Sequence, residues 1–149
     1  MHKSVGRLVS ILYRKNQVYL NAALKTYHIT ASELPILLYL YHHDGVSQEE
    51  LSSFLLIDKA STARGVHSLM EKEFIRKEKD LMDRRANKIF VTEKALDQQD
   101  AILLILQRWT NFLTEGLDEQ SVNVMFTILE EMIKKVETID FREMGNKYD

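Results

Sequence analysis

Apolar residues recur along residues 5–27 at the spacing of one face of a helix. These apolar positions are Val5, Leu8, Val9, Leu12, Tyr19, Leu20, Ala23 and Leu24. A second helix is predicted from Thr30, where residues 30–33 (TASE) have the form of a capping box. Residues 34–41 are apolar almost without interruption, so we expect this helix to be buried on most sides and to end before Gly45.

Two shorter helices are predicted next. Ser47 opens another capping box (SQEE, 47–50), and the helix that follows is expected to run to about Leu55. Its expected inner face is Leu51, Phe54 and Leu55. Asp58 is expected to cap a fourth helix from Lys59 to about Glu73. The expected inward positions of that helix are Ala63, Val66, Leu69 and Met70.

The pattern then alternates, which predicts strands at 75–79 and 87–91 joined by the polar loop 80–86. A helix is expected from Thr92 or Glu93 to Glu115, and Gly116 ends it. Asp118 is expected to cap the last helix, whose apolar stripe is Val122, Met125, Phe126, Leu129, Met132, Ile133 and Val136. The predicted fold is therefore mainly α with a small β-hairpin wing.

Composition limits the classes of protein that fit this pattern. The chain has 149 residues, 45% of them hydrophobic, which suits one domain or one small domain with helical arms. It has no apolar run long enough to span a membrane and no secretory signal, so we expect a cytoplasmic protein. Because it has no cysteine, disulfides, thiol redox sensing and thiolate zinc sites are excluded.

Charge is distributed unevenly along the chain. The net charge is +1 over residues 1–57, +3 over residues 58–94 and −6 over residues 95–149. The basic middle third favours an anionic partner, although chance scatter of surface charge would look the same.

Two short capped helices and a basic hairpin are typical of a winged helix-turn-helix with a recognition helix at 59–73. Small and hydrogen-bonding side chains on the outward turns of such a helix can reach base edges in the major groove. The candidate residues are Lys59, Ser61, Thr62, Arg64 and His67, together with Gln48 at the start of the preceding helix. Arg64 can bond a guanine bidentately. The alternative is an ordinary polar helix surface.

The loop between the predicted strands carries Asp83, Arg84 and Arg85. An arginine on a protruding wing can enter an A·T-rich minor groove, where the potential is most negative. Asp83 can orient that arginine through a charge-assisted hydrogen bond. The hairpin is therefore a second candidate DNA contact.

These residues resemble the MarR (multiple antibiotic resistance regulator) family. The resemblance rests on residues 58–64 (DKASTAR), 69–72 (LMEK), 80–86 (DLMDRRA) and 91–92 (VT). It implies a winged-helix homodimer that binds pseudo-palindromic operators and is often released by small anionic aromatic ligands. Glu73 and Ala95 depart from the family, which usually has glycine at both positions, and Gly65 lies in mid-helix without an explanation from sequence.

Sites of other kinds have weaker support. Tyr13, Arg14, Tyr39, Tyr41 and Trp109 are a guess for the ligand pocket, and the alternative is plain core and interface packing. The histidines, at positions 2, 28, 42, 43 and 67, lack the spacing of a metal site. No catalytic group stands out, and no metal or cofactor is expected.

The sequence thus predicts a cytoplasmic homodimeric repressor, a winged helix-turn-helix with helical dimerisation arms. Residues 30–91 would form the DNA-binding lobe, and residues 1–29 and 92–149 the helical dimerisation region. The expected partners are double-stranded DNA, a second copy of the chain and a small aromatic or lipophilic anion, with no membrane. One alternative is a helical protein-interaction module without DNA binding, and another is a small enzyme with a helical core.

Overall fold

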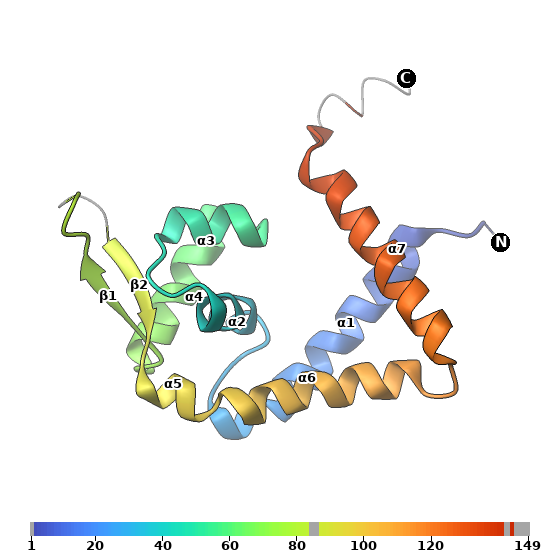
Figure 1. Cartoon of the computed structure of the whole chain (residues 1–149), viewed down its shortest axis with the longest axis horizontal. Coiled ribbons are helices and arrows are strands. Elements are labelled where there is room, and N and C mark those ends of the chain that lie inside the picture. Colours follow the sequence, from blue (N-terminus) through green and yellow to red (C-terminus); the bar gives the residue numbers. More distant parts are fainter. Residues whose placement is uncertain (1, 84–86, 142–143, 145–149) are drawn as a thin grey trace. The chain divides into compact units, whose positions relative to one another are not determined.

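A computed structural model describes residues 2–83, 87–141 and 144 (Figure 1). The chain divides into two compact units, Met1–Trp109 and Thr110–Asp149. The first unit begins with α1 (Val5–Ala23), a 3-10 turn (Lys25–Tyr27), α2 (Leu34–His42), α3 (Gln48–Leu55) and α4 (Lys59–Glu71). It continues with β1 (Ile75–Lys79), β2 (Asn87–Val91), α5 (Glu93–Asp97) and most of α6 (Gln99–Thr114). The second unit contains the end of α6 and α7 (Glu119–Glu137).

The core of the first unit forms around α2, whose apolar run is buried as expected. Leu37 and Leu40 are inaccessible to solvent and Ile36 nearly so. Fully buried partners come from the surrounding elements: Leu24, Leu51, Val66, Leu69, Phe74, Ile89 and Ile102. Burying this apolar surface drives α3, α4 and the hairpin to assemble on α2.

Caps and a tight turn set the boundaries of α3 and α4. The Ser47 hydroxyl accepts the Glu50 N–H at 3.1 Å, and the Asp58 carboxylate accepts the Ser61 N–H at 2.8 Å. Between the helices, Leu56 adopts a left-handed conformation with φ 54°. The Ser52 hydroxyl donates to the Ile57 carbonyl at 2.6 Å, so the turn is closed from inside the lobe.

Both predicted strands form and pair antiparallel, from Ile75 opposite Val91 to Lys79 opposite Asn87. Its base is joined to the lobe, because the Ile89 N–H donates to the Val46 carbonyl at 2.8 Å and the Gly45 N–H donates to the Ile89 carbonyl at 2.9 Å. In Figure 1 the two strands lie beside α2 and α4.

Three expectations about the elements are wrong. Phe54 is not on an inner face, because its side chain is 61% exposed and packs at the surface against Tyr39, with ring centroids 4.4 Å apart. The single helix expected from residue 92 to 115 is two helices, since the Gln98 N–H bonds to the Ala95 carbonyl in a tight turn. The first helix ends at Ala23, and a 3-10 turn completes the expected segment.

The structure accounts for two unusual positions near α4. A Cβ atom at Gly65 would lie 2.6 Å from Cδ1 of Ile36, so glycine lets α4 approach α2 closely. Glu73 has φ 63°, a left-handed conformation that glycine adopts without strain. A glutamate therefore occupies a turn that favours the glycine usual in the family.

The buried carboxylate of Glu33 joins the start of α2 to the end of α4. Both capping-box bonds form, with the Thr30 N–H donating to Glu33 at 3.0 Å and the Glu33 N–H to the Thr30 hydroxyl at 3.3 Å. The same carboxylate accepts hydrogen bonds from the Ser68 hydroxyl and from the Lys72 ammonium, the latter at 2.8 Å. Burial acts to raise the pKa of Glu33, but the bonds from Lys72, Ser68 and Thr30 outweigh it, so the pKa lies below its usual range.

We predict that Glu33→Gln lowers the free energy of unfolding by about 1–3 kcal/mol at neutral pH, because an amide cannot satisfy all these donors. Since the folded pKa is depressed, the carboxylate stabilises the fold at pH values above its unfolded pKa and loses this effect as pH falls through the folded value. The difference between variant and parent should therefore shrink below about pH 4. Denaturant unfolding of the variant and the parent, at neutral pH and below about pH 4, measures this difference in free energy.

Glu71→Gln is the matched control, because this exposed carboxylate pairs only with His67 among the contacts described for it. It should change the free energy of unfolding by less than about 0.5 kcal/mol. Equal losses for Glu33→Gln at neutral and acid pH would contradict the assigned role of the charge.

Candidate nucleic-acid interface

The outward face of α4 carries a row of polar and basic side chains. Lys59, Arg64 and His67 are exposed, and Ser61 is half-buried beside them. The opposite face holds Val66 and Leu69, which are inaccessible to solvent. Packing of the apolar face therefore determines which side chains α4 presents, and the presented set has the donors that phosphates and base edges accept.

A chain of hydrogen bonds orders the first turn of this face. The Ser61 hydroxyl donates to Asp58 at 2.7 Å and accepts from the Arg64 guanidinium at 2.9 Å. The hydrogen bonds from the Ser61 hydroxyl and N–H lower the pKa of Asp58, with a smaller contribution from Arg64. Asp58 therefore stays ionised and caps α4, while Arg64 is held along the exposed surface.

Thr62 does not belong to this face, so the expectation that it points outward is wrong. Its side chain is inaccessible to solvent, and its hydroxyl donates to the Asp58 carbonyl at 2.9 Å. Position 62 lies four residues before Val66 and seven before Leu69, so the three side chains share the buried face of α4. A threonine there satisfies its own hydroxyl with the helix backbone.

The start of α3 and the hairpin extend the polar surface. The Lys77 ammonium on β1 donates to the Gln48 side chain at 3.4 Å. Lys59 and Glu49 form a long surface ion pair of 4.0 Å. Asp83 is exposed, and Arg84 and Arg85 lie outside the described residues. The described part of the interface thus joins α3, α4 and β1.

A cavity of about 740 Å³ lies in the first unit beside α4. It is bordered by Tyr13 and Gln17 of α1, residues 30–36 around the start of α2 except Leu34, and Leu55 and Ile57 near the α3–α4 turn. Ser61, Arg64, Gly65 and Ser68 of α4 complete it. Residues of the candidate interface therefore also line a cavity, so an occupant would touch α4 directly.

The residues guessed for a ligand pocket are not brought together around this cavity. Of Tyr13, Arg14, Tyr39 and Trp109, Tyr13 lines it and the others do not. Arg14 is exposed and donates to the Ser10 hydroxyl at 2.6 Å. Tyr39 stacks on His43 with ring centroids 4.4 Å apart, and Trp109 stacks on Tyr19 at 4.9 Å. Tyr41 donates to the Ala95 carbonyl at 2.6 Å, and burial raises its pKa to about 12.

Sequence reasoning missed the junction of Glu33, Ser68 and Lys72 that supports the interface from behind. The capping box identified Glu33 as a partner of Thr30 but gave no sign of the other two contacts. Lys72 lies 39 residues away along the chain, so only the tertiary fold pairs it with Glu33. The one sequence signal for these contacts was the position of Glu33 next to a long apolar run, because a charge buried there needs partners.

Within residues 2–83, 87–141 and 144, three or more potential metal ligands do not gather at any point. Over the same part of the chain, each helix is too short or too polar to cross a membrane.

Comparisons with known proteins agree with this geometry. A family model described as "MarR family" matches residues 29–86. The crystal structure of a MarR transcriptional regulator from Methanosarcina mazei Go1 is 32% identical, covers 88% of this chain and 94% of its own, and has a TM-score of 0.84. The uncharacterised HTH-type transcriptional regulator YybA of Bacillus subtilis (strain 168) is 23% identical over 96% of both chains.

A putative MarR family transcriptional regulator from Listeria monocytogenes, crystallised in complex with a 26mer DNA, shares the fold. It is 19% identical, covers 91% of each chain and has a TM-score of 0.86. The mainly helical winged fold expected from the sequence is thus confirmed. The similarity to the M. mazei protein extends over nearly the whole chain, and the chain belongs to the MarR family of transcriptional regulators.

Proposed function

We propose that this chain is a homodimeric, sequence-specific DNA-binding repressor whose α4 reads base edges in the major groove. The observation that carries the proposal is the orientation of α4, which buries Val66 and Leu69 and presents Lys59, Ser61 and Arg64. Membership of the MarR family and the DNA complex of the Listeria monocytogenes protein support it. Residues 30–91 are the proposed DNA-binding lobe.

We assign base reading to Arg64 and backbone contacts to Lys59 and to the basic hairpin. Arg64 lies on the exposed face of α4, where a guanidinium can bond the two acceptors of a guanine. Its bond to the Ser61 hydroxyl at 2.9 Å uses one of the five guanidinium N–H donors and leaves the others for DNA. The proposed role of Arg84 and Arg85, entry into the minor groove, rests on the sequence alone.

We predict that Arg64→Ala flattens base preference at one or two positions of each half-site, at a cost of roughly 1–3 kcal/mol on the preferred base. The preferred duplex is first selected from random DNA with the purified parent. Binding is then measured across single-base variants of that duplex at two salt concentrations, because phosphate contacts make affinity fall steeply with salt.

Arg108→Ala is the control, since it removes the same charge from an exposed position on α6. It should keep the base preference of the parent. A uniform loss across all duplexes with Arg64→Ala would assign Arg64 to phosphate and contradict base reading. Failure of the parent to select any duplex would support a protein-interaction module without DNA binding.

The terminal helices support dimerisation through residues 1–29 and 92–149. On α1, Val5, Leu8, Val9 and Leu12 are each about half exposed. On α7, none of the side chains is buried, and the exposed apolar residues include Val124, Phe126, Ile128, Leu129, Met132, Ile133 and Val136. Apolar faces of this extent are costly in water, and a second copy of the chain can cover them.

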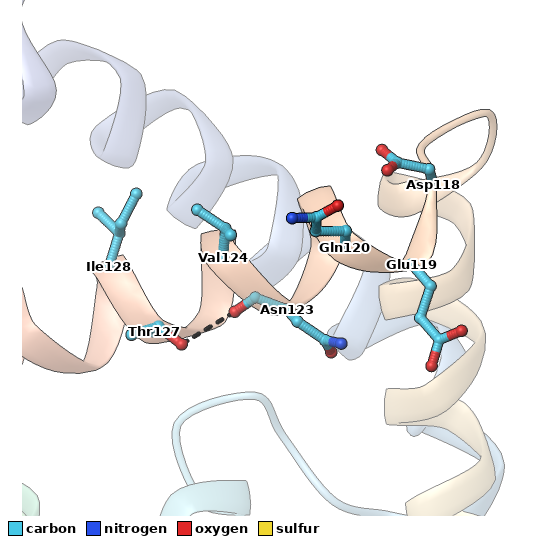
Figure 2. Close-up of a pocket in the computed structure, with 7 residues that line it drawn as sticks. All are labelled: Asp118, Glu119, Gln120, Asn123, Val124, Thr127 and Ile128. Carbon is cyan, nitrogen blue, oxygen red and sulfur yellow. Dashed lines mark hydrogen bonds between the residues drawn. The ribbon is translucent and has the colours of Figure 1, made fainter.

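Figure 2 shows the first turns of α7, where Val124 and Ile128 project on the same side of the helix. The Thr127 hydroxyl bonds back to the Asn123 carbonyl at 3.0 Å. A shallow hollow of about 670 Å³ follows this surface and is lined by α7 and its capping residue Asp118. Val124 and Ile128 are its apolar lining residues, and the others are polar or charged.

We predict that replacing both Leu129 and Ile133 with Glu yields monomers, because the new charges would have to be buried in the dimer contact. Sedimentation of the purified chain measures the oligomeric state. Replacing Glu130 and Glu131 with Gln, on the same turn, should leave a dimer intact. A soluble, unchanged dimer of the Leu129 and Ile133 variant would exclude α7 from the contact.

We further propose that a small anionic aromatic ligand releases the DNA by occupying the cavity beside α4. Leu55 and Ile57 offer apolar surface there, Tyr13 offers a ring, and the Arg64 guanidinium can pair with a carboxylate. Glu33, which also lines the cavity, is already paired with Lys72. A ligand bonded to Arg64 would compete with guanine for the same donors.

We expect Tyr13→Ala to raise about tenfold the concentration of a substituted benzoate needed for half release, because the ring contact is lost. Fluorescence anisotropy of the selected duplex, titrated with a benzoate panel, measures release. Arg14→Ala is the control, since Arg14 does not line the cavity. Impaired release with Arg14→Ala and unchanged release with Tyr13→Ala would place the ligand elsewhere.

A further inference from the structure

The loop that leaves β1 displays two adjacent apolar side chains almost entirely in solvent. Leu81 is 98% exposed and Met82 is 95% exposed, the highest values among the large apolar residues described. Large apolar side chains presented together in water mark contact surfaces more often than single exposed ones. Neither residue contributes to the core, so the fold does not explain them.

The position of this pair is determined by the residue before it. The Asp80 carboxylate accepts the Met82 N–H at 2.9 Å, and its second oxygen lies 3.7 Å from the Lys88 ammonium. The Met82 bond is the main reason why the pKa of Asp80 is lowered, so the carboxylate stays ionised and the turn is kept. Leu81 and Met82 are thus held at the end of a hairpin whose base is bonded to the lobe.

The strands that lead to this pair are basic. The two strands contain four basic residues, Arg76, Lys77, Lys79 and Lys88. Their one acidic residue, Glu78, pairs with Arg76. Two phosphate backbones border the minor groove, and a basic hairpin complements both of them. A protein partner or a second copy of the acidic C-terminal third would meet the charge equally well. Only DNA also offers stacked base steps, between which apolar side chains can insert, with a line of phosphates on either side.

We propose that Leu81 and Met82 form an apolar wedge, which enters the minor groove beside each half-site and partly unstacks a flanking base step. Leucine and methionine are used in this way by proteins that bend DNA from the minor groove. The cost of unstacking depends on sequence and is lowest at pyrimidine–purine steps. The wedge would thus add specificity at positions that make no hydrogen bond with the protein. This inference rests on the proposed DNA-binding function.

The test uses the full chain and the selected duplex with its flanks changed to a TA step or to an A-tract. The variant is Leu81→Gln with Met82→Gln, which keeps side-chain length and net charge but removes the apolar surface. The control is Leu56→Gln, an equivalent change at a 59% exposed position in the turn between α3 and α4. Affinity is measured by anisotropy, and unstacking by the fluorescence of 2-aminopurine in the flanking step.

The parent is expected to prefer the TA flank and to raise 2-aminopurine fluorescence there. The double variant should bind the TA duplex about tenfold more weakly, lose the flank preference and the fluorescence rise, and keep the salt slope, since no charge is lost. The control should behave as the parent. A double variant with the affinity and flank preference of the parent would overturn the wedge while leaving DNA binding intact.

Two other outcomes also overturn the proposal. If the double variant changes the sedimentation of the free protein, Leu81 and Met82 contact a second copy. If the parent binds none of the duplexes, the proposed function fails and the wedge fails with it. Thermal unfolding checks that the double variant folds, as expected for side chains that are more than nine-tenths exposed.

Discussion

The carboxylate of Glu33 is the constraint on which the lobe depends. It is nearly inaccessible to solvent and accepts hydrogen bonds from Thr30 just before α2, from Ser68 of α4 and from Lys72 just after α4. A buried charge is costly unless every oxygen is bonded, so α2 and α4 are stable in the one relative position that satisfies it. Gly65 leaves room for the terminal methyl of Ile36 where the two helices meet. The direction in which Arg64 points follows from these contacts.

Much of the fold was accessible from local sequence signals. The caps at Ser47 and Asp58, the hairpin strands and the left-handed Gly45 depend on neighbouring residues, and each was predicted from its pattern. The break at Gln98 was not, because no glycine or proline marks it. Phe54 was misplaced because helical spacing predicts which residues share a face, and its tertiary neighbours decide whether that face is covered.

The candidate site was predicted less completely than the fold, because part of it depends on contacts between segments far apart in the chain. Lys59, Ser61, Arg64 and His67 were predicted on the outward face from their helical positions. Thr62 was misplaced among them, although it stands four residues before Val66 and seven before Leu69, which is the spacing of the buried face. The Glu33–Lys72 contact and the cavity beside α4 join segments far apart in the chain. The guessed ligand residues failed as a group because aromatic composition contains no information on which rings stack on which, as Trp109 does on Tyr19.

The central claim, that the outward face of α4 reads the major groove, is tested most directly by dimethyl sulfate protection of the selected duplex. This reagent methylates guanine N7 in the major groove, where a recognition helix would shield it. The account predicts two protected patches related by the two-fold axis of the duplex and about 10 base pairs apart, centre to centre. Guanine N7 reactivity that is unchanged throughout a fully bound duplex would contradict it.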